Sequence, residues 1–163
     1  MAKQTMLAVN FDDLAQQIRE AGGNVQKAAN KAAAETGAII HDELLKQANA
    51  ANVPADVTGA IREKYKNQNG VVSASVGWDL TGYDPKNLSA GYKALFASYG
   101  TKPRTTKEGG QRVFINGRWV TLGTDRGSVP ASNFIKTAKK KAATKAKKAQ
   151  KKVLENTLKD LKQ

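Results

Sequence analysis

The chain has no cysteine, one histidine, few aromatic residues and no long apolar run. Without cysteine it forms neither disulfides nor thiolate sites, which fits a reducing cytosol. His41 stands beside Asp42 and Glu43 in a helical pattern, so a histidine-based metal site or catalytic triad lacks partners. No stretch approaches the roughly 20 apolar residues of a membrane span. The segment Met1–Thr5 lacks the apolar run of a secretory leader, so we expect no signal peptide and no membrane partner.

Groups for catalysis are also missing from the sequence. The pairs Asp12-Asp13 and Asp42-Glu43 are sequence neighbours, and neighbours on a helix do not share a face. Gly109-Gly110 lacks the Lys-Ser/Thr that follows a phosphate-binding loop. We therefore expect no enzymatic activity, no catalytic residues, no metal site and no cofactor.

Positive charge is what the chain has in excess, with a formal net charge of +13. Residues 136–163 hold 11 Lys and two acidic residues, whereas residues 1–135 hold 16 Lys and Arg and 12 acidic residues. The excess therefore belongs to the C-terminal segment. A localised basic element favours a polyanion or an acidic protein surface as partner, and a solvated helix that keeps the protein soluble is the alternative.

The apolar periodicity predicts an α+β fold. Apolar residues three and four apart predict a first helix that Asn10 or Asp12 caps and Gly22-Gly23 ends. The same periodicity predicts helices over 24–50 and over 88–99, the last with Tyr92, Leu95, Phe96 and Tyr99 on one face. Alternation over 71–78 predicts a half-buried strand, and the apolar run 6–9 fits an edge strand. Asn116-Gly117 between β-branched and aromatic flanks predicts a β-hairpin over 112–122. We expect N-terminal helices packed on a small antiparallel sheet with a hairpin, followed by a long basic C-terminal helix.

The last helix could run from a cap at Ser132 to Gln163. At 1.5 Å per residue its length is roughly 45–50 Å, too long to lie wholly on so small a core. Its middle offers only alanines for burial among lysines. We therefore expect a domain over 1–138 and a protruding Lys-rich helical extension over 139–163. Val153, Leu154, Leu158 and Leu161 near its end favour a partner helix over DNA.

Two short segments separated by the hairpin carry the most specific pattern: Tyr99-Gly100-Thr101 and Val129-Pro130-Ala131-Ser132-Asn133-Phe134-Ile135. Gly100 suits a tight helix exit, and Pro130 cannot continue a strand ladder. The arrangement resembles the tail-completion and head–tail joining proteins (neck and tail-terminator proteins) of long-tailed bacteriophages, in which Gly-Thr is followed by Pro-Ala-x-x-Phe-[Leu/Ile]-x-x-Ala. Upstream, Thr58-Gly59-Ala60-Ile61-Arg62 is similar to the family's Thr-Gly-x-Leu-Arg. The chain departs from the family at Ser132 and Asn133, where Arg is frequent, and at Ser98, where an acidic residue is common.

The resemblance covers roughly residues 10 to 138 and implies a structural virion protein, assembled in the host cytoplasm. Family members cap the tail tube or join it to the connector around the DNA passage. The resemblance therefore implies a homo-oligomeric ring at the head–tail junction, a hexamer or a dodecamer, that contacts other phage neck and tail proteins and touches genomic DNA non-specifically. The motif positions with a structural role are then Thr58, Gly59, Arg62, Gly100, Thr101, Pro130, Ala131 and Phe134.

Basic residues are the candidate contacts with a DNA channel or a partner, because scattered Lys and Arg hold DNA without reading its sequence. One group follows Thr101 and continues into the hairpin: Lys102, Arg104, Lys107, Arg112, Arg118 and Arg126. The other lies on the last helix: Lys139, Lys140, Lys141, Lys145, Lys147 and Lys148. A solvent-exposed hairpin without such a role is the simpler alternative for the first group. The rival function is a nucleic-acid-binding protein that uses its Lys-rich helix, which leaves the Gly-Thr and Pro-Ala segments unexplained.

Overall fold

A computed structural model of the chain describes residues 11–68, 71–80, 84, 87–102, 112–115, 118–121 and 128–162, with the backbone alone over 112–115 and 118–121. Its elements are, in order, α1 (Asp12–Glu20), α2 (Val25–Ala50), α3 (Ala55–Thr58), β1 (Arg62–Gln68), β2 (Val71–Gly77), α4 (Ala90–Tyr99), β3 (Arg112–Ile115), β4 (Arg118–Thr121) and α5 (Phe134–Leu161). The mixture of helices with small antiparallel sheets and a long C-terminal helix confirms the predicted fold class. The predicted strand at 6–9, most of the loop after Thr101 and the Asn116-Gly117 turn lie outside the described residues.

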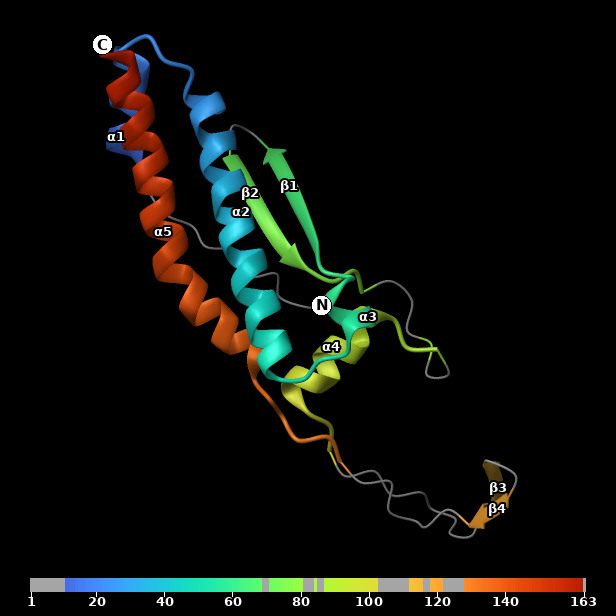
Figure 1. Ribbon diagram of the computed structural model, residues 1–163. Coiled ribbons are helices and arrows are strands. Elements are labelled where there is room, and N and C mark those ends of the chain that lie inside the picture. The colour runs from blue at the N-terminus through green and yellow to red at the C-terminus, as the bar shows by residue number, and fades with distance from the viewer. Residues whose placement is uncertain are drawn as a thin grey trace.

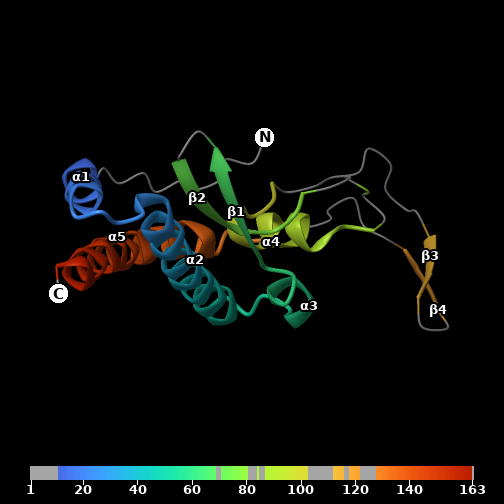
Figure 2. The ribbon, with the colours of Figure 1, turned by 90° about the horizontal axis from the view of Figure 1, so that it is seen from above.

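The two long helices form the body of the molecule. α2 and α5 run antiparallel along most of their lengths, and the sheet of β1 and β2 packs on another side of α2 (Figure 1). α1 lies beside the C-terminal part of α5, and α3 and α4 gather at the opposite end, where α5 begins (Figures 1 and 2). The hairpin of β3 and β4 stands away from this body in both views (Figures 1 and 2).

Local signals in the sequence explain where α2 begins and ends. The Asn24 side chain accepts a hydrogen bond from the Lys27 amide at 2.9 Å, which caps the first turn. At the other end Asn52 adopts a φ of +53°, and Pro54 follows. A positive φ interrupts helical geometry, and the residue before a proline disfavours the helical conformation. The predicted boundaries of this helix are therefore confirmed.

The sheet on α2 contains one strand that the apolar pattern did not indicate. β1 and β2 pair antiparallel, with Tyr65 opposite Ala74, and every residue of β1 is exposed. Tyr65 and Glu63 lie over Gly37 of α2, where a Cβ atom would come within 2.6 Å of the Tyr65 hydroxyl. That hydroxyl donates to the Glu63 carboxylate, which raises the pKa of Tyr65 to about 12. Gly37 thus leaves the space in which β1 can approach the helix.

Buried apolar side chains form one cluster at each end of the α2–α5 pair. One core joins the end of α2 to the start of α5 and to α3 and α4, with these buried members: Leu44, Ala48, Val53, Val57, Ile61, Ala94, Phe134 and Ala138. The other core joins α1 to the opposite ends of the pair, with Ile18, Ala28, Leu154 and Leu158. The described residues therefore form two small cores rather than one.

The C-terminal helix does not protrude, which corrects the expectation from its composition. Ala138, Ala142 and Ala146, spaced four apart, are at most 3% exposed where α5 packs on α2. Alanines at this spacing form one face and allow two helix backbones to approach closely, while the lysines occupy the rest of the circumference and stay hydrated. The expected domain boundary after residue 138 falls within this continuous helix.

One local expectation at the start of α5 is also wrong. Ser132 does not cap α5, because the N-cap residue is Asn133 with a φ of +55° and no capping side-chain bond. The buried residues of α4 are Gly91, Ala94 and Ser98, whereas Tyr99 is 58% exposed. Small side chains let α4 lie close to α3 and to the start of α5, so its larger residues point elsewhere.

Candidate functional site

The two separated segments Tyr99–Thr101 and Val129–Ile135 meet directly in space, and we call their junction the clasp. Gly100 ends α4 with a φ of +75°. The Thr101 amide donates to the Val129 carbonyl at 2.9 Å, and the Val129 amide donates to the Thr101 hydroxyl at 2.9 Å. A Cβ atom on Gly100 would lie 2.6 Å from the Val129 oxygen and 2.9 Å from the Ala131 nitrogen. Only glycine therefore fits this approach.

A second set of bonds ties the clasp to the end of α4. The Ser132 hydroxyl and amide both donate to the Ala97 carbonyl, at 2.6 and 3.2 Å, and the Asn133 amide donates to the Ser98 carbonyl at 2.8 Å. In return, the Ser98 hydroxyl accepts the Ile135 amide at 3.3 Å. The last carbonyls of α4 thereby receive hydrogen bonds from Ser132 and Asn133, and an amide at the start of α5 finds its acceptor in Ser98.

The third motif, Thr58–Arg62, reaches the same core through Trp78. Phe134 is 2% exposed and meets the Trp78 ring edge to face, with centroids 6.0 Å apart and an interplanar angle of 88°. The Trp78 indole donates to the Val57 carbonyl at 2.6 Å. Arg62 donates to the Gly59 carbonyl at 3.0 Å, which closes the turn after α3. The structure therefore brings all three sequence motifs to one end of the molecule.

Pro130 and Ala131, two motif positions between the bonded residues, are exposed. Val129 and Tyr99 beside them are 42% and 58% exposed. The motif thus combines a buried anchor, Phe134, with an apolar outer surface at the clasp.

The clasp brings together the two ends of the segment 102–128, which we call the arm. The arm holds six Lys and Arg and two acidic residues. Lys102 is exposed at its start, and Arg112 and Arg118 begin the paired strands β3 and β4, whose register places Phe114 opposite Trp119. Arg104, Lys107 and Arg126 lie outside the described residues. The paired strands confirm the predicted hairpin, and the arm begins and ends at the hydrogen-bonded clasp.

The lysines of α5 predicted as contacts are all exposed: Lys139, Lys140, Lys141, Lys145, Lys147 and Lys148. Two of them also reach α2, because Lys145 pairs with Glu43 at 2.9 Å and Lys141 lies 3.4 Å from the Gln47 side-chain oxygen. Other lysines have lysine neighbours four residues away, such as Lys148 and Lys152. Each such like-charged pair costs the helix roughly 0.2–0.5 kcal/mol.

Glu43 is the buried charge of the α2–α5 interface, and sequence reasoning missed it. Its side chain is 5% exposed and also accepts a hydrogen bond from Gln47 at 2.8 Å. The bond from Lys145 holds the pKa of this carboxyl below its usual value, against the opposing effect of burial. The available signal was an acidic residue next to Leu44 on the apolar face of a long helix.

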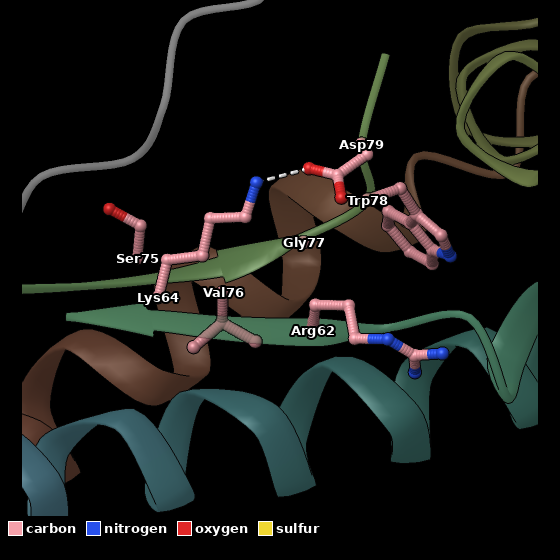
Figure 3. A pocket seen from close by; sticks show the side chains of 7 residues that line it. All are labelled: Arg62, Lys64, Ser75, Val76, Gly77, Trp78 and Asp79. Carbon is pink, nitrogen blue, oxygen red and sulfur yellow. Dashed lines mark hydrogen bonds and ion pairs between the residues drawn. The ribbon is translucent and has the colours of Figure 1, made fainter. Parts of the chain in front are cut away.

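A small hollow lies beside the motif Thr58–Arg62, on the sheet (Figure 3). Its lining includes Arg62, Lys64, Trp78 and Asp79, and Lys64 is paired with Asp79 (Figure 3). The hollow encloses about 70 Å³, well below the roughly 300–1,000 Å³ typical of ligand pockets. Because Arg62 and Trp78 also bond to backbone carbonyls, this lining serves the fold.

Other groups that could carry chemistry are dispersed. His41 lies 3.8 Å from Asp42, with 31% of its side chain exposed. Among the residues described, no three His, Asp or Glu side chains gather as metal ligands. Within the same part of the chain, no helix is both long and apolar enough to cross a membrane.

Comparisons with models of protein families, with curated proteins and with solved structures found no match for this chain.

Proposed function

We propose that this protein is a structural component of the head–tail junction of a long-tailed bacteriophage. Copies of it form a ring that completes the tail or connects the neck, around the channel through which DNA passes. The observation that carries the proposal is the clasp. The segments that resemble the phage family are far apart in sequence, and in the fold they are joined by direct hydrogen bonds between Thr101 and Val129.

The clasp supports a role in assembly because it joins a residue buried in the core to exposed apolar residues on the surface. Phe134 anchors the return of the chain in the core, whereas Pro130 and Ala131 face outward beside exposed Tyr99. Exposed apolar residues next to each other mark surfaces that contact other proteins. On this proposal the clasp surface and the arm contact neighbouring copies and other neck or tail proteins.

The resemblance implies a ring of six or twelve copies, and a heterologous contact that closes on itself produces such a ring. On this proposal the ring joins or caps the tail tube and catalyses no reaction. The basic residues of the arm give the channel wall a positive charge, which holds passing DNA weakly and without sequence preference. The protein is assembled in the host cytoplasm and ends in the virion.

Native mass spectrometry of the purified full-length protein, followed by imaging of the virion that contains it, tests the proposal. We expect closed rings, either of the protein alone or with its partner, at the head–tail junction. A stable monomer present once per particle would contradict it.

A matched pair of variants tests the arm and the clasp surface separately. Replacing residues 103–127 by a short Gly-Ser linker should leave the body folded, because Thr101 and Val129 are already in contact. We expect circular dichroism and thermal stability close to those of the parent, with heads and tails that no longer join. Tyr99→Ser, at an exposed position, tests the clasp surface with the arm intact. Normal particle yields from both variants would contradict a role for this end of the molecule.

A further inference from the structure

We propose that the solvent-facing side of α5 between Lys136 and Lys152 binds the phosphate backbone of double-stranded DNA without sequence preference. This proposal stands on the surface of α5 and does not require a ring or a virion. Its basis is the arrangement of the lysines, the absence of neighbouring acidic residues on the helix, and the burial of the apolar residues that a protein partner would need.

The lysines form two parallel rows. Residues seven and eleven positions apart on a helix lie within about 40° of each other around its axis. Lys140, Lys147 and Lys151 make one such row, and Lys141, Lys148 and Lys152 make the other. Each row extends over roughly 16 Å at 1.5 Å per residue. A DNA duplex carries one negative charge per about 1.7 Å of its axis, so each row faces several phosphates.

Most of these charges have no acidic partner on their own helix. No Asp or Glu occurs between residues 136 and 154, and Lys151 pairs with Glu155 only at the end of the rows. Lys140, Lys147, Lys148 and Lys152 are exposed and form no ion pair with other described residues. A helix that serves only solubility gains stability from alternating Glu and Lys, whereas this one tolerates repulsion that a polyanion would relieve.

The burial of the C-terminal leucines decides between DNA and a protein partner. Leu154 and Leu158 pack with Ile18 and Ala28, so most of the apolar stripe that favoured a partner helix is occupied within the chain. Leu161 at the end of the stripe is 38% exposed. Over residues 136–152 the helix has no aromatic residue, no large aliphatic residue and no arginine. Protein interfaces are enriched in aromatic residues and Arg and depleted in Lys. A phosphate attracts any cation, so lysines are sufficient to contact the DNA backbone. Recognition of base edges uses the guanidinium group of arginine, which this surface lacks.

The rows are also held in place before any ligand binds. Ala138, Ala142 and Ala146 fix α5 to α2, and the ion pair from Lys145 to Glu43 adds a link at mid-length. A helix that is already ordered loses less conformational entropy on binding than a disordered lysine tail. The surface is therefore suited to association that depends on charge alone.

The test is fluorescence anisotropy of a labelled random duplex of about 30 base pairs with the full-length protein, in NaCl from about 50 to 200 mM. The variant K140Q/K147Q/K148Q removes three free lysines from the two rows. The control K27Q/K31Q/K66Q removes three exposed lysines from α2 and β1, with the same change in net charge. Substitution is preferable to truncation, since removing Leu154 and Leu158 would expose Ile18.

We expect the parent and the control to bind with a steep salt dependence. If each of the three lysines contacts one phosphate, the slope of log K against log salt falls by about 2.7 in the α5 variant. That change corresponds to a loss of about 500-fold in affinity at about 0.1 M salt. Unchanged thermal melts verify that all three proteins are folded.

Absence of duplex binding by the parent at about 50 mM NaCl would overturn the proposal, as would equal losses in the α5 variant and the control. Polyglutamate that binds as tightly as the duplex would overturn the choice of DNA and identify an acidic protein surface as the partner. The assay reports on the surface of α5, and ring formation is read independently from the native mass.

Discussion

The clasp can be tested by the substitution Gly100→Ala, with Gly22→Ala as a matched control. Both glycines have a φ of +75°, but a Cβ atom on Gly22 would meet nothing within 4 Å. On Gly100 it would lie 2.6 Å from the Val129 oxygen. The two substitutions therefore share a positive φ, and Gly100 adds both the collision and a ψ of −179°, a combination that is essentially restricted to glycine.

The expected magnitudes follow from these contacts. Alanine at a positive φ destabilises the folded state by about 1–2 kcal/mol. About 0.4–1 kcal/mol of this loss is offset, because alanine reduces the conformational entropy of the unfolded chain relative to glycine. Gly22→Ala should therefore lower the free energy of unfolding by about 1 kcal/mol or less. Gly100→Ala also forces apart the backbones of Thr101 and Val129, which share two hydrogen bonds worth about 1 kcal/mol each. Its total should be about 3 kcal/mol.

Urea denaturation followed by circular dichroism measures both values on the full-length protein, and amide hydrogen exchange at Thr101 reports the clasp directly. We expect faster exchange at Thr101 in Gly100→Ala and parental exchange in Gly22→Ala. Losses of stability that agree within about 0.5 kcal/mol, with Thr101 still protected, would refute the close approach at Gly100.

Two further predictions concern the core beside the clasp and the α2–α5 interface. Phe134→Ala should lower the free energy of unfolding by about 3–5 kcal/mol, because Phe134 is 2% exposed and packs on Trp78; a thermal melt shifted by only a degree or so would place it on the surface. The pKa of Glu43 is lowered in the folded protein by its ion pair with Lys145. The pair therefore stabilises the fold fully at pH values above the unfolded-state pKa, near 4.3. This stabilisation is lost as the pH falls through the folded-state pKa. Glu43→Gln should therefore show a shallower fall of melting temperature on the acid side than the parent, and identical pH profiles would contradict this role.

Much of the secondary structure could be predicted from the sequence because its signals are local. Asn24 caps α2, and Asn52 with Pro54 ends it, through bonds and backbone limits that involve residues a few positions apart. The alternation of β2 and the Asn-Gly hairpin are similarly short-range. Phe134 and Ala138, four positions apart, lie on one buried face of α5, and this spacing is also a local property of the sequence.

The candidate site was predicted in its residues but not in its geometry. The sequence pointed to Gly100, Thr101 and Pro130, and only the fold shows that Thr101 bonds to Val129 across the intervening arm. Ser132 illustrates why. Its hydroxyl is suited to capping the next helix, yet it donates to the Ala97 carbonyl, an acceptor that α4 supplies from another part of the chain.

The sequence by itself determined the helices of the body, strand β2, the hairpin and the concentration of lysines near the C-terminus, because periodicity, capping and charge are properties of neighbouring residues. Only the tertiary structure decided the strand β1 and the place of α5. β1 is polar throughout, and its conformation is tied to backbone pairing with β2. The alanines of α5 suit an isolated helix as well as a packed one. Their burial depends on the packing of α5 against α2, whose Glu43 and Gln47 bond to Lys145 and Lys141 from 102 and 94 positions earlier in the chain.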